Sequence, residues 1–214
     1  MIKIIKKHKL IFLIFILAIL LRILFLDTSY FFWDETIYIM NSEFISTGNA
    51  PYVQLYERPL LLSLLVIPFI KSEIMLRLFM IILNSLAVFA IYFLASNFGR
   101  KTGIISAFLL AIFPFHIMAS RWVMTDSLSF LFITLTISFY VKGIKNKKLG
   151  SYVLGGIFLS LSILLKFTNI ILLPLLIILF FFFKSSFRKT IYSLFVAFML
   201  FLPYLIFNHV YFGN

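Results

Sequence analysis

Long apolar runs, broken only by short polar segments, limit the fold of this chain more than any other feature. A helix needs about 20 mostly apolar residues to cross a bilayer. Seven runs approach or reach that length: 9–26, 73–96, 102–118, 126–141, 151–165, 169–183 and 190–207. Hydrophobic residues make up 63% of the chain and charged residues 12%, which excludes a soluble globular domain. We therefore expect an all-α fold, a polytopic membrane helix bundle of about seven transmembrane helices, built as one module over residues 1–214.

Basic side chains gather in every second loop of this arrangement. Four clusters, MIKIIKKHK, GRK, VKGIKNKK and KSSFRK, hold most of the 19 Lys and Arg, and the loops between them lack such clusters. Cytoplasmic loops of membrane proteins carry this excess of Lys and Arg. We therefore expect a multi-pass protein of the cell membrane, with its N-terminus in the cytoplasm and, after an odd number of spans, its C-terminus outside. All 7 Asp and Glu then fall on the external side.

Composition also bears on the partners of the chain. A net charge of +12 would suit nucleic acid, but the basic residues are spread over loops and not gathered in a polar domain, so no nucleic-acid partner is expected. The chain has no cysteine, which excludes disulfides, thiol catalysis and cysteine-bound metal. The expected environment is the lipid bilayer.

The one sizeable external segment lies between the first two spans, over residues 27–72. Its first half has apolar residues at helical spacing and polar residues opposite them: Ile37, Met40, Phe44 and Ile45 against Tyr38, Asn41 and Ser42. This pattern predicts an amphipathic helix on the membrane surface, with Asp34 as its N-cap and Gly48 at its end. The apolar stretch 60–70 is too short to cross and predicts a second interfacial helix.

Carboxylates and isolated cations share the external face. Asp34 and Glu35 are adjacent in FFWDETIYI, where the plain explanation is an N-cap and a favourable helix dipole. Five basic residues stand alone on the same side: Arg58, Lys71, Arg77, Arg121 and Lys166. Each taken singly is more often a snorkelling helix end, and Arg22 is the clearest case. Taken together, they suit a site that binds a phosphate and activates a nucleophile, because a carboxylate can accept a hydroxyl proton while cations hold an anionic leaving group.

Several segments, in this order along the spans, carry a family resemblance. A basic leader and one span precede WDE; GNAPYVQLYERPLLLSLL follows in the external loop, RWVMTDSLSFLF opens the fourth span, LSLSILLKFTNIILLPL joins the fifth and sixth, and LPYLIFNHVYFGN closes the module. The chain resembles the GT-C membrane glycosyltransferases, in the branch of the protein O-mannosyltransferases and the lipid A aminoarabinose transferases. Members of that family usually continue into further helices, whereas this chain stops at Asn214. Three alternatives stay open: a minimal enzyme, the product of a shortened gene, or a module that needs a partner subunit.

The resemblance implies a reaction and a set of residues. A sugar would pass from a polyprenyl-phosphate-linked donor to an acceptor hydroxyl on the external face, with inversion, and the acceptor would be a protein, a lipid or a glycan. Asp34 would be the general base, Glu35 would support or position it, and Asp126 would line the same cavity. The positions that meet the carrier phosphate would be Arg58, Arg121 and Lys166. No cofactor or metal is expected, with a divalent cation held by Asp34 and Asp126 as the alternative.

Four more residues are candidates for the substrate cavity: Trp33, Tyr56, His116 and His209. The plain alternative is an aromatic belt and hydrogen-bonded interfacial histidines. Two other functions also stay open. A non-catalytic protein that binds or translocates polyprenyl-phosphate lipids would use the same cations without needing Asp34. A channel or ion-coupled transporter would need charges buried within the spans, whereas nearly all charges here lie at span ends.

Overall fold

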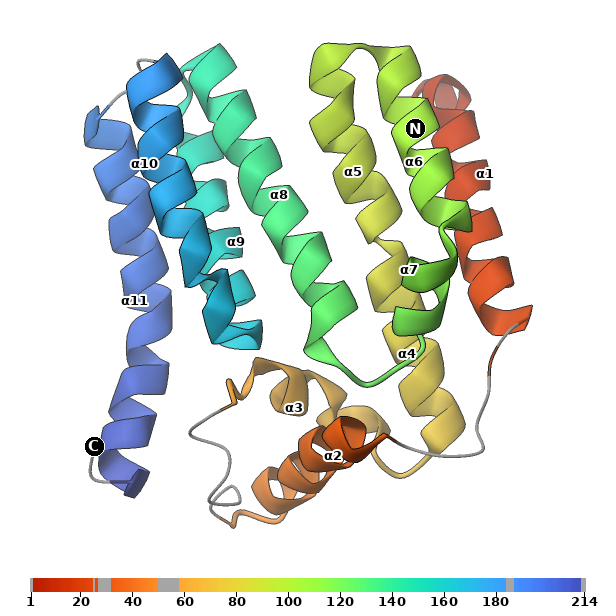
Figure 1. The fold of residues 1–214 in the computed structure, drawn as a ribbon, viewed down its shortest axis with the longest axis vertical. Helices are drawn as coiled ribbons and strands as arrows, with labels where there is room; N and C mark the ends of the chain where they lie inside the picture. Colours follow the sequence, from red (N-terminus) through yellow and green to blue (C-terminus); the bar gives the residue numbers. More distant parts are fainter. Residues whose placement is uncertain (1, 25, 27–31, 50–57, 184–186, 213–214) are drawn as a thin grey trace.

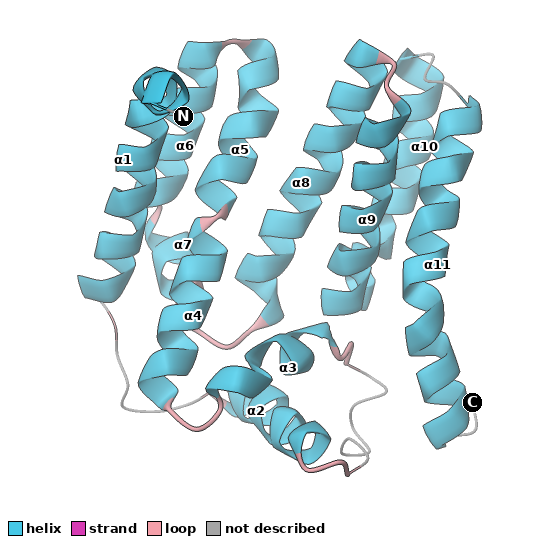
Figure 2. Cartoon of the chain, turned by 180° about the vertical axis from the view of Figure 1, so that it is seen from behind, coloured by secondary structure: helices cyan, strands magenta, loops and turns pink. Residues whose placement is uncertain are grey.

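A computed structural model describes residues 2–24, 26, 32–49, 58–183 and 187–212. Over these residues all regular secondary structure is helical, and no strand occurs (Figures 1 and 2). The helices are α1 (Ile2–Leu24), α2 (Trp33–Ser46), α3 (Leu61–Val66), α4 (Glu73–Ser85), α5 (Ala87–Ala95), α6 (Arg100–Ile112), α7 (Pro114–Ala119), α8 (Thr125–Asn146), α9 (Leu149–Leu165), α10 (Leu172–Phe183) and α11 (Phe187–Phe212), with short 3-10 helices η2 (Ile67–Phe69), η3 (Ser96–Phe98) and η4 (Phe167–Ile171). The expected all-α class is confirmed.

The helices form a bundle with a layer of two short helices across one end. Figure 1 shows α1 and α4–α7 on one side, α8–α11 on the other, and α2 with α3 lying across the end of the bundle. Close packing joins α5 to α6 and α8, α8 to α9, and α9 to α11. The N-terminus lies at the end of the bundle opposite to α2 and α3, and the C-terminus lies at the same end as these two helices (Figure 1).

Each expected span coincides with a helix or with consecutive helices. Three stretches of the described residues are long and apolar enough to cross a membrane: Glu73–Phe98, Thr125–Asn146 and Phe187–Val210. The expected span 102–118 is divided, because Pro114 disfavours helical backbone at Phe113, which is extended with φ −68° and ψ 114°. The protein is a helical membrane bundle, and the number of seven crossings stays a prediction.

Small residues let α8, α9 and α11 approach closely. A Cβ added to Gly155 of α9 would lie 2.8 Å from the ring of Tyr140, and one added to Gly143 of α8 would lie 2.9 Å from the ring of Tyr152. Each tyrosine thus packs over a glycine of the other helix. Ser193 of α11 joins them, since its Oγ accepts a hydrogen bond of 2.6 Å from Tyr140 Oη and donates one of 2.6 Å to the Tyr152 carbonyl.

The helix α2 turns its polar face inward. Its buried residues are Glu35, Tyr38, Asn41 and Ser42, and Ser42 Oγ donates to the Ser63 carbonyl of α3 at 2.8 Å. Of its apolar residues, Met40 is exposed, as expected of an interfacial helix, whereas Ile45 packs against Leu60 and Tyr204. The expected N-cap is wrong: α2 begins at Trp33 and its N-cap is Phe32, because Glu35 Oε2 accepts the Phe32 amide at 2.8 Å and fulfils the capping function that Asp34 was expected to have.

Candidate functional site

A single cavity gathers charged residues from four separate segments. Its lining includes Asp34 of α2, Arg58 before α3, Asp126 of α8 and Lys166 after α9. The volume is about 300 Å³. We call this hollow the charged cavity. The sequence predicted these four residues as one site, and the fold places them together.

Local structure explains why these side chains reach the cavity. Asp34 and Asp126 lie in the first turns of α2 and α8, where a carboxylate is favoured by the helix dipole. Lys166 ends α9 in an extended conformation, with φ −152° and ψ 115°, before η4 begins. Arg58 immediately precedes Pro59, which fixes the start of the turn into α3.

Two ion pairs occupy the charged cavity. Arg58 Nη2 lies 2.6 Å from Asp34 Oδ1, and Lys166 Nζ lies 2.5 Å from Asp126 Oδ1. The two carboxylate side chains are 46% and 60% exposed, so solvent screens both pairs. Such exposed pairs contribute only about 0–1 kcal/mol, and a ligand can therefore exchange them at small cost.

Tyr38 lines the charged cavity, and Arg58 lies over its ring. The Arg58 guanidinium carbon lies 5.6 Å from the centre of the Tyr38 ring, within the range of a cation–π interaction. Partial burial alone would lower the pKa of Arg58, but the hydrogen bond to Asp34 and the neighbouring Tyr38 and Asp34 outweigh it and raise this pKa above its ordinary value. Arg58 is therefore always positively charged. Tyr38 is a cavity residue that sequence analysis missed, although it lies one helical turn after Asp34.

An apolar groove adjoins the charged cavity. It has a volume of about 380 Å³, and the side chains along it include Ile45, Leu64, Pro203 and Phe207. Consecutive residues line the two hollows: Pro59 and Leu165 line the charged cavity, and their neighbours Leu60 and Leu164 line the groove. One hollow is lined by cations and the other by hydrocarbon side chains, a combination that suits an anionic lipid.

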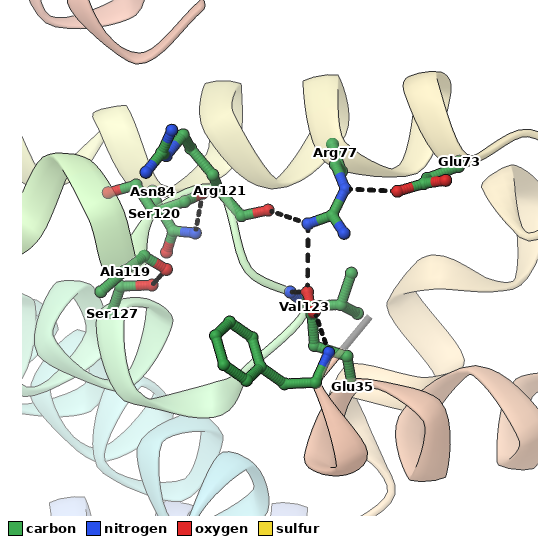
Figure 3. Close-up of polar contacts among 10 residues, drawn as sticks. Glu35, Glu73, Arg77, Asn84, Ala119, Ser120, Arg121, Val123 and Ser127 are labelled. Atoms are coloured by element: carbon green, nitrogen blue, oxygen red, sulfur yellow. Dashed lines mark hydrogen bonds and ion pairs between the residues drawn. The ribbon is translucent and has the colours of Figure 1, made fainter. Parts of the chain in front are cut away.

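Glu35 does not line the charged cavity, although it follows Asp34 directly. Its side chain is fully buried and accepts three hydrogen bonds (Figure 3). The donors are the Phe32 amide at 2.8 Å, the Val123 amide at 2.7 Å and Arg77 Nη1 at 3.2 Å. The predicted supporting role of Glu35 therefore has a defined set of contacts, none of them in the cavity. Arg77 had no predicted role beyond that of an external cation.

Arg121 also lies outside the cavity lining. Its carbonyl accepts a hydrogen bond from Arg77 Nη1 at 3.2 Å, so its backbone belongs to the Glu35 network. Figure 3 shows the Arg121 side chain directed away from Glu35 and Arg77. The structure therefore brings together two of the three predicted phosphate-binding cations, Arg58 and Lys166.

Three of the four predicted substrate-cavity residues, Trp33, His116 and His209, are not among those that line the charged cavity. Trp33 is 76% exposed at the start of α2, and His209 is exposed near the end of α11. His116 is buried, and its Nδ1 accepts a hydrogen bond of 2.7 Å from Arg22 Nη2. Tyr56 lies outside the described residues.

Arg22 was expected to snorkel towards the membrane surface, and that expectation is wrong. The side chain is fully buried. Besides His116, its Nη1 donates to the Ala18 carbonyl at 2.7 Å and to the Ala111 carbonyl at 3.4 Å. Neighbouring backbone oxygens thus solvate the guanidinium inside the bundle, so it has no need to reach the surface.

The residues available for a metal are the two cavity carboxylates, Asp34 and Asp126. Within the part of the chain that the structure describes, no group of three or more His, Asp or Glu is arranged to hold a metal ion. Each carboxylate instead contacts a cationic side chain.

Comparison with known proteins identifies a family. A family model described as dolichyl-phosphate-mannose-protein mannosyltransferase matches residues 59–207, which is more than half of the chain and includes Asp126 and Lys166. No curated protein and no solved structure matches the chain. The chain therefore belongs to the dolichyl-phosphate-mannose-protein mannosyltransferase family and is a membrane glycosyltransferase of the GT-C type.

Proposed function

We propose that this protein transfers a sugar, mannose or a close relative, from a polyprenyl-phosphate-linked donor to an acceptor hydroxyl at the external face of the membrane. The observation that carries the proposal is the charged cavity, in which two carboxylates and two cations meet beside an apolar groove. The acceptor hydroxyl belongs to a protein, a lipid or a glycan. The family match supports a mannosyltransferase-like reaction, and the cavity supports a phosphate-bearing lipid donor.

Arg58 and Lys166 bind the donor phosphate. In the structure both cations are paired with carboxylates at the cavity surface. A phosphate offers more acceptor oxygens and more negative charge than either carboxylate, so it draws both cations to itself. The polyprenyl chain then extends along the apolar groove. Donor binding therefore frees Asp34 from its partner.

Asp34 acts as the general base once Arg58 has turned to the phosphate. It accepts the acceptor's hydroxyl proton while the hydroxyl oxygen attacks the anomeric carbon and the bond from that carbon to the phosphate oxygen breaks. The products are the glycosylated acceptor, the polyprenyl phosphate and protonated Asp34. A single displacement inverts the anomeric carbon. Asp126 lines the same cavity and holds the acceptor, and the two cations absorb the charge of the leaving group without a metal.

The test uses the full chain purified into liposomes, a polyprenyl-phosphate-linked mannose as donor, and a panel of peptide, lipid and glycan hydroxyl acceptors. We expect Asp34→Asn to lower kcat by about 100-fold or more, because proton transfer by a positioned base contributes that much. The same variant retains donor binding. The matched control is Glu43→Gln, which removes an exposed carboxylate from the same helix and leaves turnover unchanged. Transfer at the wild-type rate by Asp34→Asn would remove the proposed base.

A second candidate function uses the same cavity for lipid binding and catalyses no reaction. The cations and the apolar groove would also serve a protein that only binds or translocates a polyprenyl-phosphate lipid. Such a protein binds the donor equally well with Asp34 or Asn at position 34, and it transfers sugar to no acceptor of the panel. Addition of a chelator to the same assay tests metal use, and we expect transfer to continue unchanged. The anomeric configuration of the product, compared with that of the donor, tests inversion.

A further inference from the structure

The carboxylate of Glu35 joins three parts of the chain. Oε2 accepts the Phe32 amide at the start of α2, and Oε1 accepts the Val123 amide before α8 together with Arg77 Nη1 of α4. Glu35 is 0% exposed and Arg77 is 2% exposed. The contacts with Val123 and Arg77 are buried, and the contact with Phe32 is part-buried. Hydrogen bonds to a charged group are strong in such surroundings.

Arg77 extends these contacts in two directions. Its Nε donates to Glu73 Oε1 one turn earlier in α4, at 2.8 Å, and its Nη1 also donates to the Arg121 carbonyl at 3.2 Å (Figure 3). The segment 121–123 is thus bonded at Arg121 to the arginine and at Val123 to the glutamate. One buried ion pair holds the short connection between α7 and α8.

The position of this pair along the chain gives it a further role. Glu35 follows Asp34, and Val123 precedes Asp126 by three residues. The same carboxylate therefore fixes the backbone next to both acids of the charged cavity. A buried ion pair contributes little to the stability of a fold, because the cost of desolvating the two charges offsets most of their attraction. A role in holding the geometry of the site therefore accounts better for this pair.

We infer that Glu35 and Arg77 form a latch that positions Asp34 relative to Asp126 by clamping the start of α2 to the segment before α8. Glu35 and Arg77 are positioning residues and do not touch the substrate. The inference rests on the proposed function for the roles of Asp34 and Asp126. The latch itself is a property of the fold, so it can be tested without any transfer reaction.

The chain contains a suitable reporter for the latch. It has 2 tryptophans, Trp33 and Trp122. The Trp122 ring lies in the clamped segment and packs edge-on against Phe32, with ring centres 4.8 Å apart. In a Trp33→Phe background, the fluorescence of Trp122 alone therefore reports whether the segment 121–123 stays against the start of α2.

Glu35→Gln is the main variant. The amide keeps one acceptor oxygen, but it loses the charge and cannot accept from both Phe32 and Val123 while pairing with Arg77. The matched control is Glu73→Gln, which changes the other carboxylate bound to Arg77 and contacts neither amide. If Glu35→Gln does not fold, Glu35→Met combined with Arg77→Met removes both buried charges together. Glu73 also loses Arg77 in this variant, but its side chain is 31% exposed and water can solvate it.

The latch is tested by two measurements, the fluorescence of Trp122 and the kcat of sugar transfer. We expect Glu35→Gln, or the double variant, to shift Trp122 emission to longer wavelength and to raise its quenching by acrylamide, whereas Glu73→Gln changes neither. With both tryptophans present, the same variants lower kcat by about tenfold or more, because small misplacements of catalytic groups are costly. Their KM for the donor stays unchanged, since Arg58 and Lys166 are intact.

The latch is overturned if Trp122 in the folded variants behaves as in the parent. Its positioning role is overturned if Glu35→Gln transfers sugar with the parent kcat while Asp34→Asn does not. Failure of the proposed function has a different signature. In that case Asp34→Asn turns over at the full rate while Trp122 still responds to Glu35→Gln. The fluorescence readout thus separates an absent latch from an incorrect assignment of the base.

Discussion

Asp34 and Glu35 are adjacent and chemically similar, yet the fold gives them opposite surroundings. Asp34 is 46% exposed and Glu35 is 0% exposed. An exposed pair with Arg58 is weak and exchangeable, worth about 0–1 kcal/mol. Loss of one partner from a buried pair costs about 3–5 kcal/mol, so the pair of Glu35 with Arg77 is permanent. This difference separates a carboxylate that can react from one that holds the backbone.

At the residue scale, Lys166 is the cation whose loss is easiest to interpret. We expect Lys166→Ala to raise the donor KM about 10- to 100-fold, because a hydrogen bond from a charged group to phosphate contributes about 1.5–3 kcal/mol. The measurement is donor saturation of sugar transfer in liposomes. Lys71→Ala, which removes an exposed lysine on the same side of the bundle but outside the cavity lining, is the control and leaves KM unchanged. A fall in kcat at constant KM would argue against a phosphate contact.

At the scale of elements, the packing of α8 against α9 determines where the second ion pair forms. Asp126 lies in the first turn of α8, and Lys166 ends α9, so the antiparallel pair brings both to the same end (Figure 1). Tyr140 of α8 packs on a glycine of α9, and Tyr152 of α9 packs on a glycine of α8. These two contacts fix the register of the two helices. A sliding of α9 by one turn, about 5.4 Å, would separate Lys166 from Asp126.

Among the glycines of α9, Gly156 is the one where an added Cβ would meet the backbone of a neighbouring helix, and it provides a stability test. A Cβ at Gly156 would clash with the backbone carbonyl oxygen of Ser193 in α11 and would lie 2.8 Å from the Oγ of the same serine. An alanine at this position therefore requires α11 to move. We expect Gly156→Ala to lower the stability by about 1–3 kcal/mol. Gly150→Ala, in the first turn of the same helix and with open space around it, raises stability by about 0.5–1 kcal/mol. Thermal unfolding in detergent measures both, and equal midpoints would contradict the packing argument.

At the scale of the whole molecule, hydropathy and charge predicted the helices well, because both depend on residues close in sequence. The convergence of Asp34, Arg58, Asp126 and Lys166 was predicted from the order of motifs, and the fold brings these four residues to one cavity. Burial could not be predicted for a single charge. Arg22 was expected at the surface and is enclosed, because the carbonyl of Ala111, far along the chain, solvates it.

Orientation in the membrane is the prediction that belongs to the whole molecule, and the absence of cysteine makes it direct to test. We expect Glu43→Cys in α2 to react with a membrane-impermeant maleimide in intact cells, because α2 lies at the end of the bundle that carries the charged cavity. Lys148→Cys, at the α8–α9 turn on the opposite end, reacts only after the membrane is opened. Both positions are exposed, so reactivity reports the side of the membrane and not burial. The reverse pattern would place the charged cavity at the cytoplasmic face, and sugar transfer outside the membrane could then not occur there.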